Sequence, residues 1–217
     1  EALHKMVQRK LPVTMVGAGL PQIAELAGDA KSYAERLFKF PAIGVLDPDD
    51  AKAALSRPAA TDGVTYSADA LEEAVASTGG YPYFLQELGY AVWTAADGPE
   101  VSLADVRLAE PNYETKLDAS FFRVRLDRAT ELQRSYLRAM AQLGPDAHKA
   151  SDVADVMGRT SQNLGPTRAE LINMGLLYTP EHGYAAFTVP HFDRFMRRAI
   201  PRLDVPPRRP RPRRSKT

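Results

Sequence analysis

The sequence predicts a mainly α-helical protein that begins with a short α/β piece and ends with a β-hairpin, a last helix and a basic tail. Three observations support this fold class: helix-start and helix-stop residues recur from Asp47 onward, two short apolar runs precede that point, and a hairpin pattern follows Gly175. The length of 217 residues suits one to two domains. Hydrophobic residues make up 44% and charged residues 25% of the chain, so disorder of the whole chain is not expected.

The composition excludes several classes of function. The chain contains no cysteine, which rules out disulfides, thiolate catalysis and cysteine-ligated zinc. Its four histidines lie far apart in the sequence, so no metal site is predicted. No apolar stretch is long enough for a membrane-spanning helix, and the first residues lack the pattern of a signal peptide. We therefore expect a cytoplasmic protein without a membrane span.

Charge is distributed unevenly along the chain. The formal net charge is +1, but residues 202–217 contain seven basic residues and one acidic residue. Residues 129–201 are nearly balanced, with eight basic and seven acidic residues, so the acidic excess lies in residues 1–128. A basic, proline-rich end predicts a disordered tail that contacts a polyanion such as nucleic acid or an anionic membrane surface. The alternative is a tail that only keeps the protein soluble.

The first 46 residues are expected to be the end of an α/β domain. Apolar residues at helical spacing are followed by an apolar run at 11–16, a glycine-containing turn at 17–21 and a second apolar run at 42–46. Each run predicts a short buried strand. Because the backbone of a buried strand needs a neighbouring strand, we expect the rest of the sheet to lie in upstream sequence.

A helical domain is predicted for residues 47–128. Asp47 precedes a proline and two acidic residues, as is typical of a helix start, and Gly79 with Gly80 is typical of a helix stop. From Pro82 onward, apolar residues recur at helical spacing and predict a wide buried stripe. Five helices are predicted to start at or just after Asp47, Ser67, Pro82, Ser102 and Pro111.

Residues 129–201 follow a different pattern, in which three helices precede a hairpin and a last helix. The predicted elements are a helix at 130–143, a short helix capped by Ser151, a helix at 161–174, strands at 176–179 and 184–189, and a helix at 191–200. A turn at 180–183 joins the two strands. This order is typical of a winged helix-turn-helix domain.

The Gly17-Ala18-Gly19 segment precedes a predicted helix and raises the question of a phosphate-binding loop. The Rossmann spacing requires a third glycine where this chain has Gln22, and the GxxxxGK[ST] pattern occurs nowhere in the sequence. We interpret these glycines as a tight strand-to-helix turn. The chain on its own is therefore not expected to be an enzyme or to bind ATP tightly.

Four segments are informative as a set: VGAGLP at 16–21, GDAKSYAERLFKF at 28–40, GGYPYFLQ at 79–86 and GPTRAELINMGLL at 165–177. In this order they resemble the C-terminal half of a prokaryotic P-loop ATPase of the AAA+/STAND type, often described as archaeal-ATPase-like. The resemblance implies the end of an ATPase core at 1–46, a helical lid at 47–128, a winged helix at 129–201 and a disordered basic tail at 202–217. It also implies that the Walker A and Walker B segments, which bind ATP and Mg²⁺, lie in an upstream ATPase core.

The resemblance assigns nucleotide contacts to two places. Arg36 stands where such ATPases can place an arginine that reaches the γ-phosphate of a neighbouring subunit, which also implies a homo-oligomer. The alternative for Arg36 is an ion pair with a neighbouring acidic residue. Gly80, Tyr81 and Pro82 resemble the Gly-x-Pro turn of STAND lids, which packs against adenine. The alternative for this turn is a plain helix boundary.

The third predicted helix of the winged helix carries the candidate DNA contacts. The N-terminal half of a recognition helix is where base edges and phosphates are met, and His182 lies at the predicted wing tip. The candidate residues are Arg159, Thr160, Ser161, Gln162, Asn163, Thr167, Arg168 and His182. The alternative is a winged helix that contacts protein, because the near-zero net charge of residues 129–201 is low for a DNA-binding surface.

Three functions remain open from the sequence. The first is an ATP-controlled DNA-binding protein, in which nucleotide bound between an upstream core and the lid repositions the winged helix on double-stranded DNA. The second is a signalling ATPase switch whose winged helix contacts protein rather than DNA. The third is a transcription regulator that works without an ATPase core.

Overall fold

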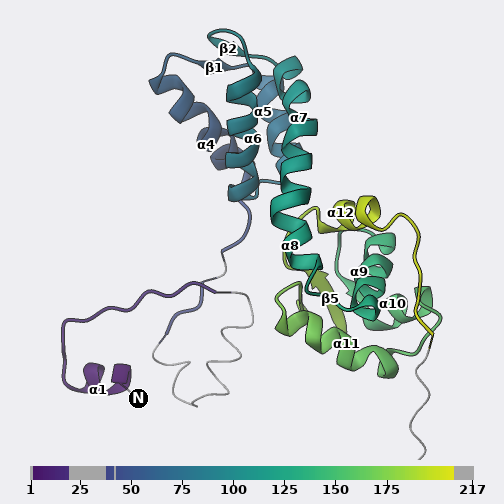
Figure 1. Cartoon of the computed structure of the whole chain (residues 1–217). Coiled ribbons are helices and arrows are strands. Elements are labelled where there is room, and N and C mark those ends of the chain that lie inside the picture. Colours follow the sequence, from purple (N-terminus) through teal and green to yellow (C-terminus); the bar gives the residue numbers. More distant parts are fainter. Residues whose placement is uncertain (1, 20–37, 42, 208–217) are drawn as a thin grey trace, which may run out of the picture. The chain divides into compact units, whose positions relative to one another are not determined.

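The computed structural model describes residues 2–19, 38–41 and 43–207. The chain divides into two compact units, Glu1–Ile43 and Gly44–Thr217. The first unit contains one helix among its described residues, α1 (Ala2–Gln8). The second unit is mainly helical with short strands (Figure 1).

The first unit differs from the expected end of an α/β domain. Among its described residues there is no strand, and the apolar side chains of Leu11, Val13, Met15 and Val16 are exposed. A strand needs a neighbour to complete its backbone hydrogen bonds, and the described part of this unit supplies none. The predicted strand at 11–16 is therefore not formed. Of the second predicted strand, residues 43–46 have no strand pairing, and residue 42 lies outside the described residues.

The second unit begins with a helical bundle made of α4, α5, α6 and α7. Helices α5 and α6 pack against α7, and α4 packs against α5 and α6. A parallel pair of two-residue strands joins the loop before α5 to the loop before α7. The bounds are α4 Pro48–Thr61, β1 Thr65–Tyr66, α5 Ala68–Thr78, α6 Pro82–Ala95, β2 Glu100–Val101 and α7 Leu103–Leu117.

Four of the five predicted helix starts in this bundle are confirmed. The Asp47 carboxylate caps α4 by accepting from the backbone N–H groups of Asp49 (3.0 Å) and Asp50 (3.1 Å). Ser102 forms a capping box with Asp105 at the start of α7. Helix α5 starts after Ser67, and α6 starts at a proline, which fits the first helical position because its missing N–H would have no partner there.

The fifth predicted start, at Pro111, is wrong, because Pro111 lies inside α7. A proline inside a helix removes one backbone hydrogen bond and costs about 3 kcal/mol. Ala109, Tyr113 and Leu117 are buried on both sides of this proline in the sequence, and their packing outweighs that cost. The helix even continues beyond α7, through a π-helical turn (η1, Asp118–Phe122) into α8 (Arg123–Leu126).

The C-terminal module, residues 130–199, has the predicted order of helix, short helix, helix and hairpin. Helices α10, α11 and α12 all pack against α9, which is buried along most of its length. The bounds are α9 Glu131–Leu143, β3 His148–Lys149, α10 Ala150–Val156, α11 Ser161–Asn173, β4 Leu177–Tyr178, β5 Tyr184–Phe187 and α12 Phe192–Ala199.

Two details of this module differ from the prediction. Helix α10 starts after Lys149, so Ser151 lies within the helix and is not its cap. A third strand, β3, pairs antiparallel with β5, which gives the sheet order β3-β5-β4. The sequence did not predict β3 because two residues are too few to show the alternation of a strand.

An aromatic junction joins the helical bundle to the C-terminal module. The ring of Phe122 lies 5.7 Å from Phe84 of α6 and 5.1 Å from Phe195 of α12, measured between ring centroids. Beside it, the guanidinium of Arg198 donates to both carboxylate oxygens of Asp118, at 2.9 and 2.7 Å. Bundle and module therefore share one hydrophobic core and belong to one compact unit.

The chain after α12 does not leave the core at once. Residues 200–206 run along α9, and Leu203 and Val205 are partly buried against the core. This differs from the prediction of a disordered tail from residue 202, because these two apolar side chains and several backbone carbonyls have partners on α9 and beside α11. Residues 208–217 lie outside the described residues.

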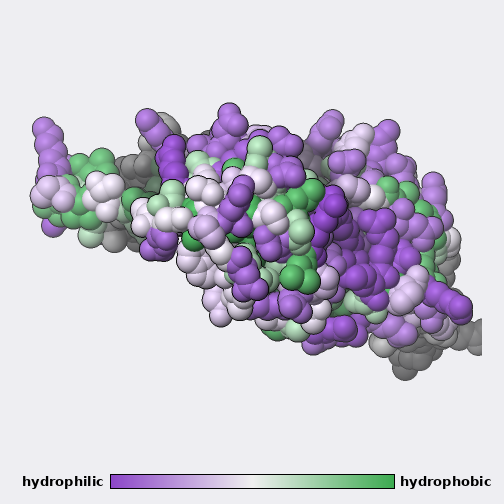
Figure 2. All heavy atoms as spheres, turned by 90° about the horizontal axis from the view of Figure 1, so that it is seen from above, coloured by the Kyte–Doolittle hydropathy of each residue, from purple (hydrophilic) through white to green (hydrophobic). Residues whose placement is uncertain are grey.

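The surface is largely hydrophilic in the view of Figure 2, with smaller hydrophobic areas between the polar side chains. None of the helices in the part of the chain that the structure describes has the length and apolar character needed to cross a membrane.

Candidate nucleic-acid interface and nucleotide-contacting turn

The turn between α10 and α11 exposes the start of α11. Gly158 ends the preceding helix with a φ of +61°, a backbone conformation that favours glycine. Thr160 then caps α11, with its hydroxyl accepting from the backbone N–H of Asn163 at 3.4 Å. The side chains of Ser161, Gln162 and Asn163 are exposed. The structure thus brings four of the predicted DNA contacts together at one accessible helix end.

Arg159, just before this cap, is already engaged. Its Nη2 group donates to the backbone carbonyl of Pro206, and the side chain is half-buried. The sequence could not show this contact because the two residues are far apart in the chain. Arg159 therefore holds the C-terminal segment at the start of α11, whatever else its other N–H groups contact.

Thr167 and Arg168 lie further along α11 and are half-buried. Arg168 is four residues after Leu164 and three before Leu171, both of which are buried, so it shares the inner side of the helix. Burial raises the pKa of the Tyr136 phenol on α9, and the positive charge of Arg168 partly opposes that rise. Arg168 thus lies near the interface with α9, whereas Gln162 and Asn163 point to solvent.

His182 occupies the turn between β4 and β5 and is exposed, as expected for a wing tip. The charge near α11 is mixed. Asp152 and Asp155 are exposed on α10, and Lys149 is exposed at the end of β3. The described surface around α11 thus combines exposed amide and hydroxyl groups with few free cations.

The turn at Gly80, Tyr81 and Pro82 is shaped by the incoming chain. The backbone N–H of Leu46 donates to the carbonyl of Gly80 at 2.9 Å. A Cβ atom at residue 80 would lie 2.7 Å from the carbonyl oxygen of Leu46, and the φ of +68° also favours glycine. Any larger residue would push this entry segment away. The Tyr81 ring packs against Phe84 with centroids 4.7 Å apart.

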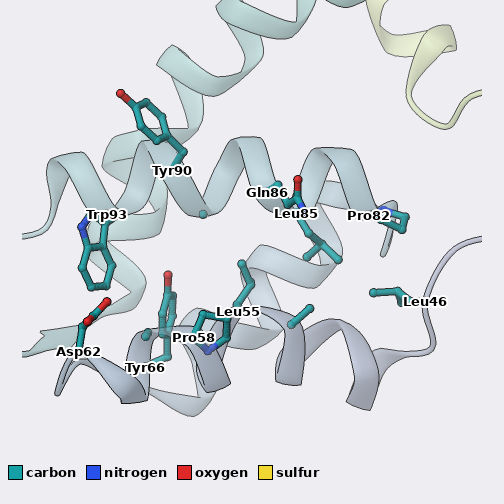
Figure 3. Close-up of a pocket in the computed structure, with 13 residues that line it drawn as sticks. Leu46, Leu55, Pro58, Asp62, Tyr66, Pro82, Leu85, Gln86, Tyr90 and Trp93 are labelled. Atoms are coloured by element: carbon teal, nitrogen blue, oxygen red, sulfur yellow. The ribbon is translucent and has the colours of Figure 1, made fainter.

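A cavity of about 530 Å³ lies beside this turn, between α4, β1 and α6. In Figure 3, Leu46 and Pro82 lie at one end of the cavity, and Asp62 and Trp93 lie at the other. The remaining described residues that line it are Ala54, Leu55, Pro58, Ala59, Tyr66, Leu85, Gln86, Gly89 and Tyr90. The cavity could accept a flat ring, but none of these lining residues is basic, so it offers no charge to a phosphate chain.

This cavity was not predicted from the sequence, although a signal for it exists. Leu85, Gly89 and Trp93 are spaced four residues apart and therefore share one side of α6. Gly89 allows α4 to approach closely, since a Cβ atom there would lie 3.0 Å from a methyl carbon of Leu55. A small residue between two large apolar ones on one helix side is the pattern that could have indicated a groove.

Arg36, the candidate arginine finger, lies outside the described residues. Within the described ranges, no group of three or more side chains is arranged to hold a metal ion.

Part of the second unit is similar to a known protein family. Residues 119–196 match a family model described as a domain of unknown function, DUF8462. The matched stretch starts in η1 and ends in α12, so it covers most of the C-terminal module and includes Phe122 of the aromatic junction. No curated protein matches the chain.

Proposed function

We propose that this chain is the lid and winged-helix portion of an AAA+/STAND-like ATPase whose nucleotide state controls binding to double-stranded DNA. The observation that carries the DNA assignment is the exposed start of α11. There, Ser161, Gln162 and Asn163 stand free of the core on a scaffold of three helices and a three-stranded sheet. Amide side chains at this end of a recognition helix are suited to the edge of adenine in the major groove.

The aromatic junction supports the link to a nucleotide. Phe122 and the Arg198–Asp118 contact join the bundle to the module, so a displacement of the bundle would carry the module with it. The proposal assigns adenine contact to the Gly80–Pro82 turn and ATP hydrolysis to an upstream core. In that arrangement, closure of the core on the lid changes the position of α11 relative to the DNA.

The test is duplex binding by the 217-residue chain, measured by fluorescence anisotropy against a pool of random DNA sequences and then against selected sites. Asn163→Ala should weaken binding to a selected site by ~1–3 kcal/mol, because it removes one base contact. The matched control is Asn173→Ala, which changes the same residue type at the exposed far end of α11 and should have little effect. Equal losses for both variants would contradict base contact by the start of α11.

A specific observation also supports the second candidate, a signalling switch whose module contacts protein. Arg159 is engaged with the Pro206 carbonyl, Arg168 is half-buried, and Asp152 and Asp155 are exposed nearby. Phosphate contacts supply most of the affinity of DNA-binding proteins, and these described residues offer few of them. Absence of duplex binding at low salt would favour this second function.

A further inference from the structure

The cavity between α4, β1 and α6 has one end whose chemistry differs from the rest of its lining. At the end away from Pro82, the Trp93 ring extends from α6 toward the carboxylate of Asp62 at the C-cap of α4 (Figure 3). Tyr66 of β1 lies beside them, with its hydroxyl group directed into the space between α4 and α6. Two aromatic rings and one acidic group therefore meet at the same end of a mainly apolar cavity.

The groups at this end are available to a ligand. Within the part of the chain that the structure describes, the Asp62 carboxylate takes part in no hydrogen bond and no ion pair, and it is exposed. The side chain of Trp93 is 47% exposed, although it is large and mainly apolar. Burial raises the pKa of the Tyr66 phenol, so its hydroxyl group stays neutral and can accept a hydrogen bond.

The charge of the cavity selects the sign of the ligand. Of the described residues that line the cavity, Asp62 is the only charged one. Helix α6 contains no lysine or arginine, and of the two basic residues of α4, Lys52 pairs with Glu72 at 3.7 Å and Arg57 does not line the cavity. The face of an indole ring is also negative and attracts cations. Carboxylate and ring therefore both favour a positively charged group.

We propose that the Asp62–Trp93 end of the cavity binds the charged group of a small organic cation, whose apolar body fills the rest of the cavity. Asp62 supplies the opposite charge and Trp93 an aromatic face, while the apolar residues of α4 and α6, such as Leu55 and Leu85, contact the body. The volume of about 530 Å³ is within the range of small-molecule sites. The ligand class is an amine or quaternary ammonium compound with a hydrocarbon or aromatic body. This site goes beyond the proposed function, because it requires neither ATP nor DNA.

The test uses the 217-residue chain and its own fluorescence. Trp93 is the only tryptophan of the sequence, so a change in tryptophan emission reports on this cavity alone. Three probes share one body and differ in charge: 4-phenylbutylammonium, 4-phenylbutanol and 4-phenylbutyrate. We expect the ammonium compound to change the emission with saturation, at a dissociation constant of roughly 0.1–1 mM for a ligand of this size. The alcohol should bind about fivefold more weakly, as expected for loss of a partly exposed ion pair, and the carboxylate more weakly still.

A charge variant tests the role of Asp62. Asp62→Asn keeps the size of the side chain and removes its charge, so it should lower the affinity for the ammonium compound about fivefold and leave that for the alcohol unchanged. The matched control is Asp146→Asn, which removes an exposed carboxylate after α9 and outside the cavity lining, and which should bind all three probes as wild type does. Equal melting temperatures would show that neither variant has lost its fold.

A second pair of variants tests the location of the site. Ala54 and Ala60 are both exposed on α4, but only Ala54 lines the cavity. Ala54→Phe should fill part of the cavity and abolish saturable binding of the ammonium compound, whereas Ala60→Phe should leave it intact. Binding that survives in Ala54→Phe would place the probe elsewhere and overturn the proposal.

Two further results would also overturn it. One is equal affinity of the wild-type chain for the ammonium compound and the alcohol, since the charge of the ligand would then not be recognised. The other is the absence of saturable binding of the ammonium compound at millimolar concentrations. No part of the test involves a nucleotide or duplex DNA, so the proposed function stands or fails independently of these results.

Discussion

Residues 11–16 and helix α9 are both rich in apolar side chains, yet only α9 has a core around it. In the first segment, Val16 is 91% exposed, and Leu11, Val13 and Met15 are exposed as well. In α9, Leu137 and Met140 are completely buried. The comparison teaches that an apolar segment is buried in a hydrophobic core only where other segments of the same chain pack against it.

The reason lies in what surrounds each segment. Helix α9 is covered by α10, α11 and α12, and residues 200–206 cover another part of it. A helix also satisfies its own backbone hydrogen bonds, whereas an extended segment depends on a neighbouring strand. Among the described residues of their unit, residues 11–16 therefore have neither apolar segments to cover their side chains nor a neighbouring strand to pair with their backbone.

The largest expected effect is in backbone hydrogen exchange. The amides of Val13–Val16 should exchange almost without protection, while those at the centre of α9 should open only with global unfolding, which typically requires ~5 kcal/mol or more. Mass spectrometry after a series of exchange times would measure the difference. Equal protection of the two segments would break the comparison, because it would mean that residues 13–16 have found another sheet or a partner chain.

The second prediction concerns the aromatic junction. Phe122→Ala should lower the free energy of unfolding by ~3–5 kcal/mol, because Phe122 is buried among rings of α6 and α12 and its removal leaves a cavity. Chemical denaturation would give this value. The matched control is Phe40→Ala in the first unit, where the side chain is 41% exposed and less stability should be lost. A similar loss for both variants would contradict the contrast between the two units.

Much of the second unit could be predicted from the sequence because its signals are local. Caps at Asp47, Ser102 and Thr130 act within three residues of the helix start, and the hairpin turn at 180–183 joins adjacent strands. The continuation of α7 through Pro111 could not be predicted, since tertiary packing decides it. The same holds for the course of residues 200–206 along α9, where Arg138 and Ile200 meet only after the chain has folded.

The candidate site shows the same division between local and distant signals. The exposed start of α11 follows from the cap at Thr160 and the glycine before it, and both can be recognised in the sequence. The inner position of Arg168 also follows from helix periodicity, once Leu164 and Leu171 are taken as core residues. The engagement of Arg159 with Pro206 is a distant contact with no sequence signal.

The smallest expected effect is a pH dependence within the core of the second unit. His191 lies near Phe84 with ring centroids 6.0 Å apart, and burial lowers its pKa below the ordinary value of 6.5. The positive charge of Arg194, and more weakly that of Arg198, lowers the pKa further, while Asp193 and the Thr78 backbone oppose this. The folded protein therefore takes up this proton at a lower pH than the unfolded chain does.

The sign of the effect follows from proton binding. Below pH 6.5 the unfolded chain holds a proton on His191 that the folded protein does not, so the free energy of unfolding should fall as the pH is lowered from 6.5. Urea denaturation between pH 7.5 and 5 would measure the slope, and His191→Asn should flatten it, because asparagine tolerates the positive φ of 62° at this position and does not titrate. His182→Asn, in the exposed turn between β4 and β5, is the control and should keep the wild-type slope. If His191→Asn kept the wild-type slope, as His182→Asn is expected to do, the burial of His191 would not be linked to folding. The buried and the exposed histidine would then not differ in their effect on the pH dependence of stability.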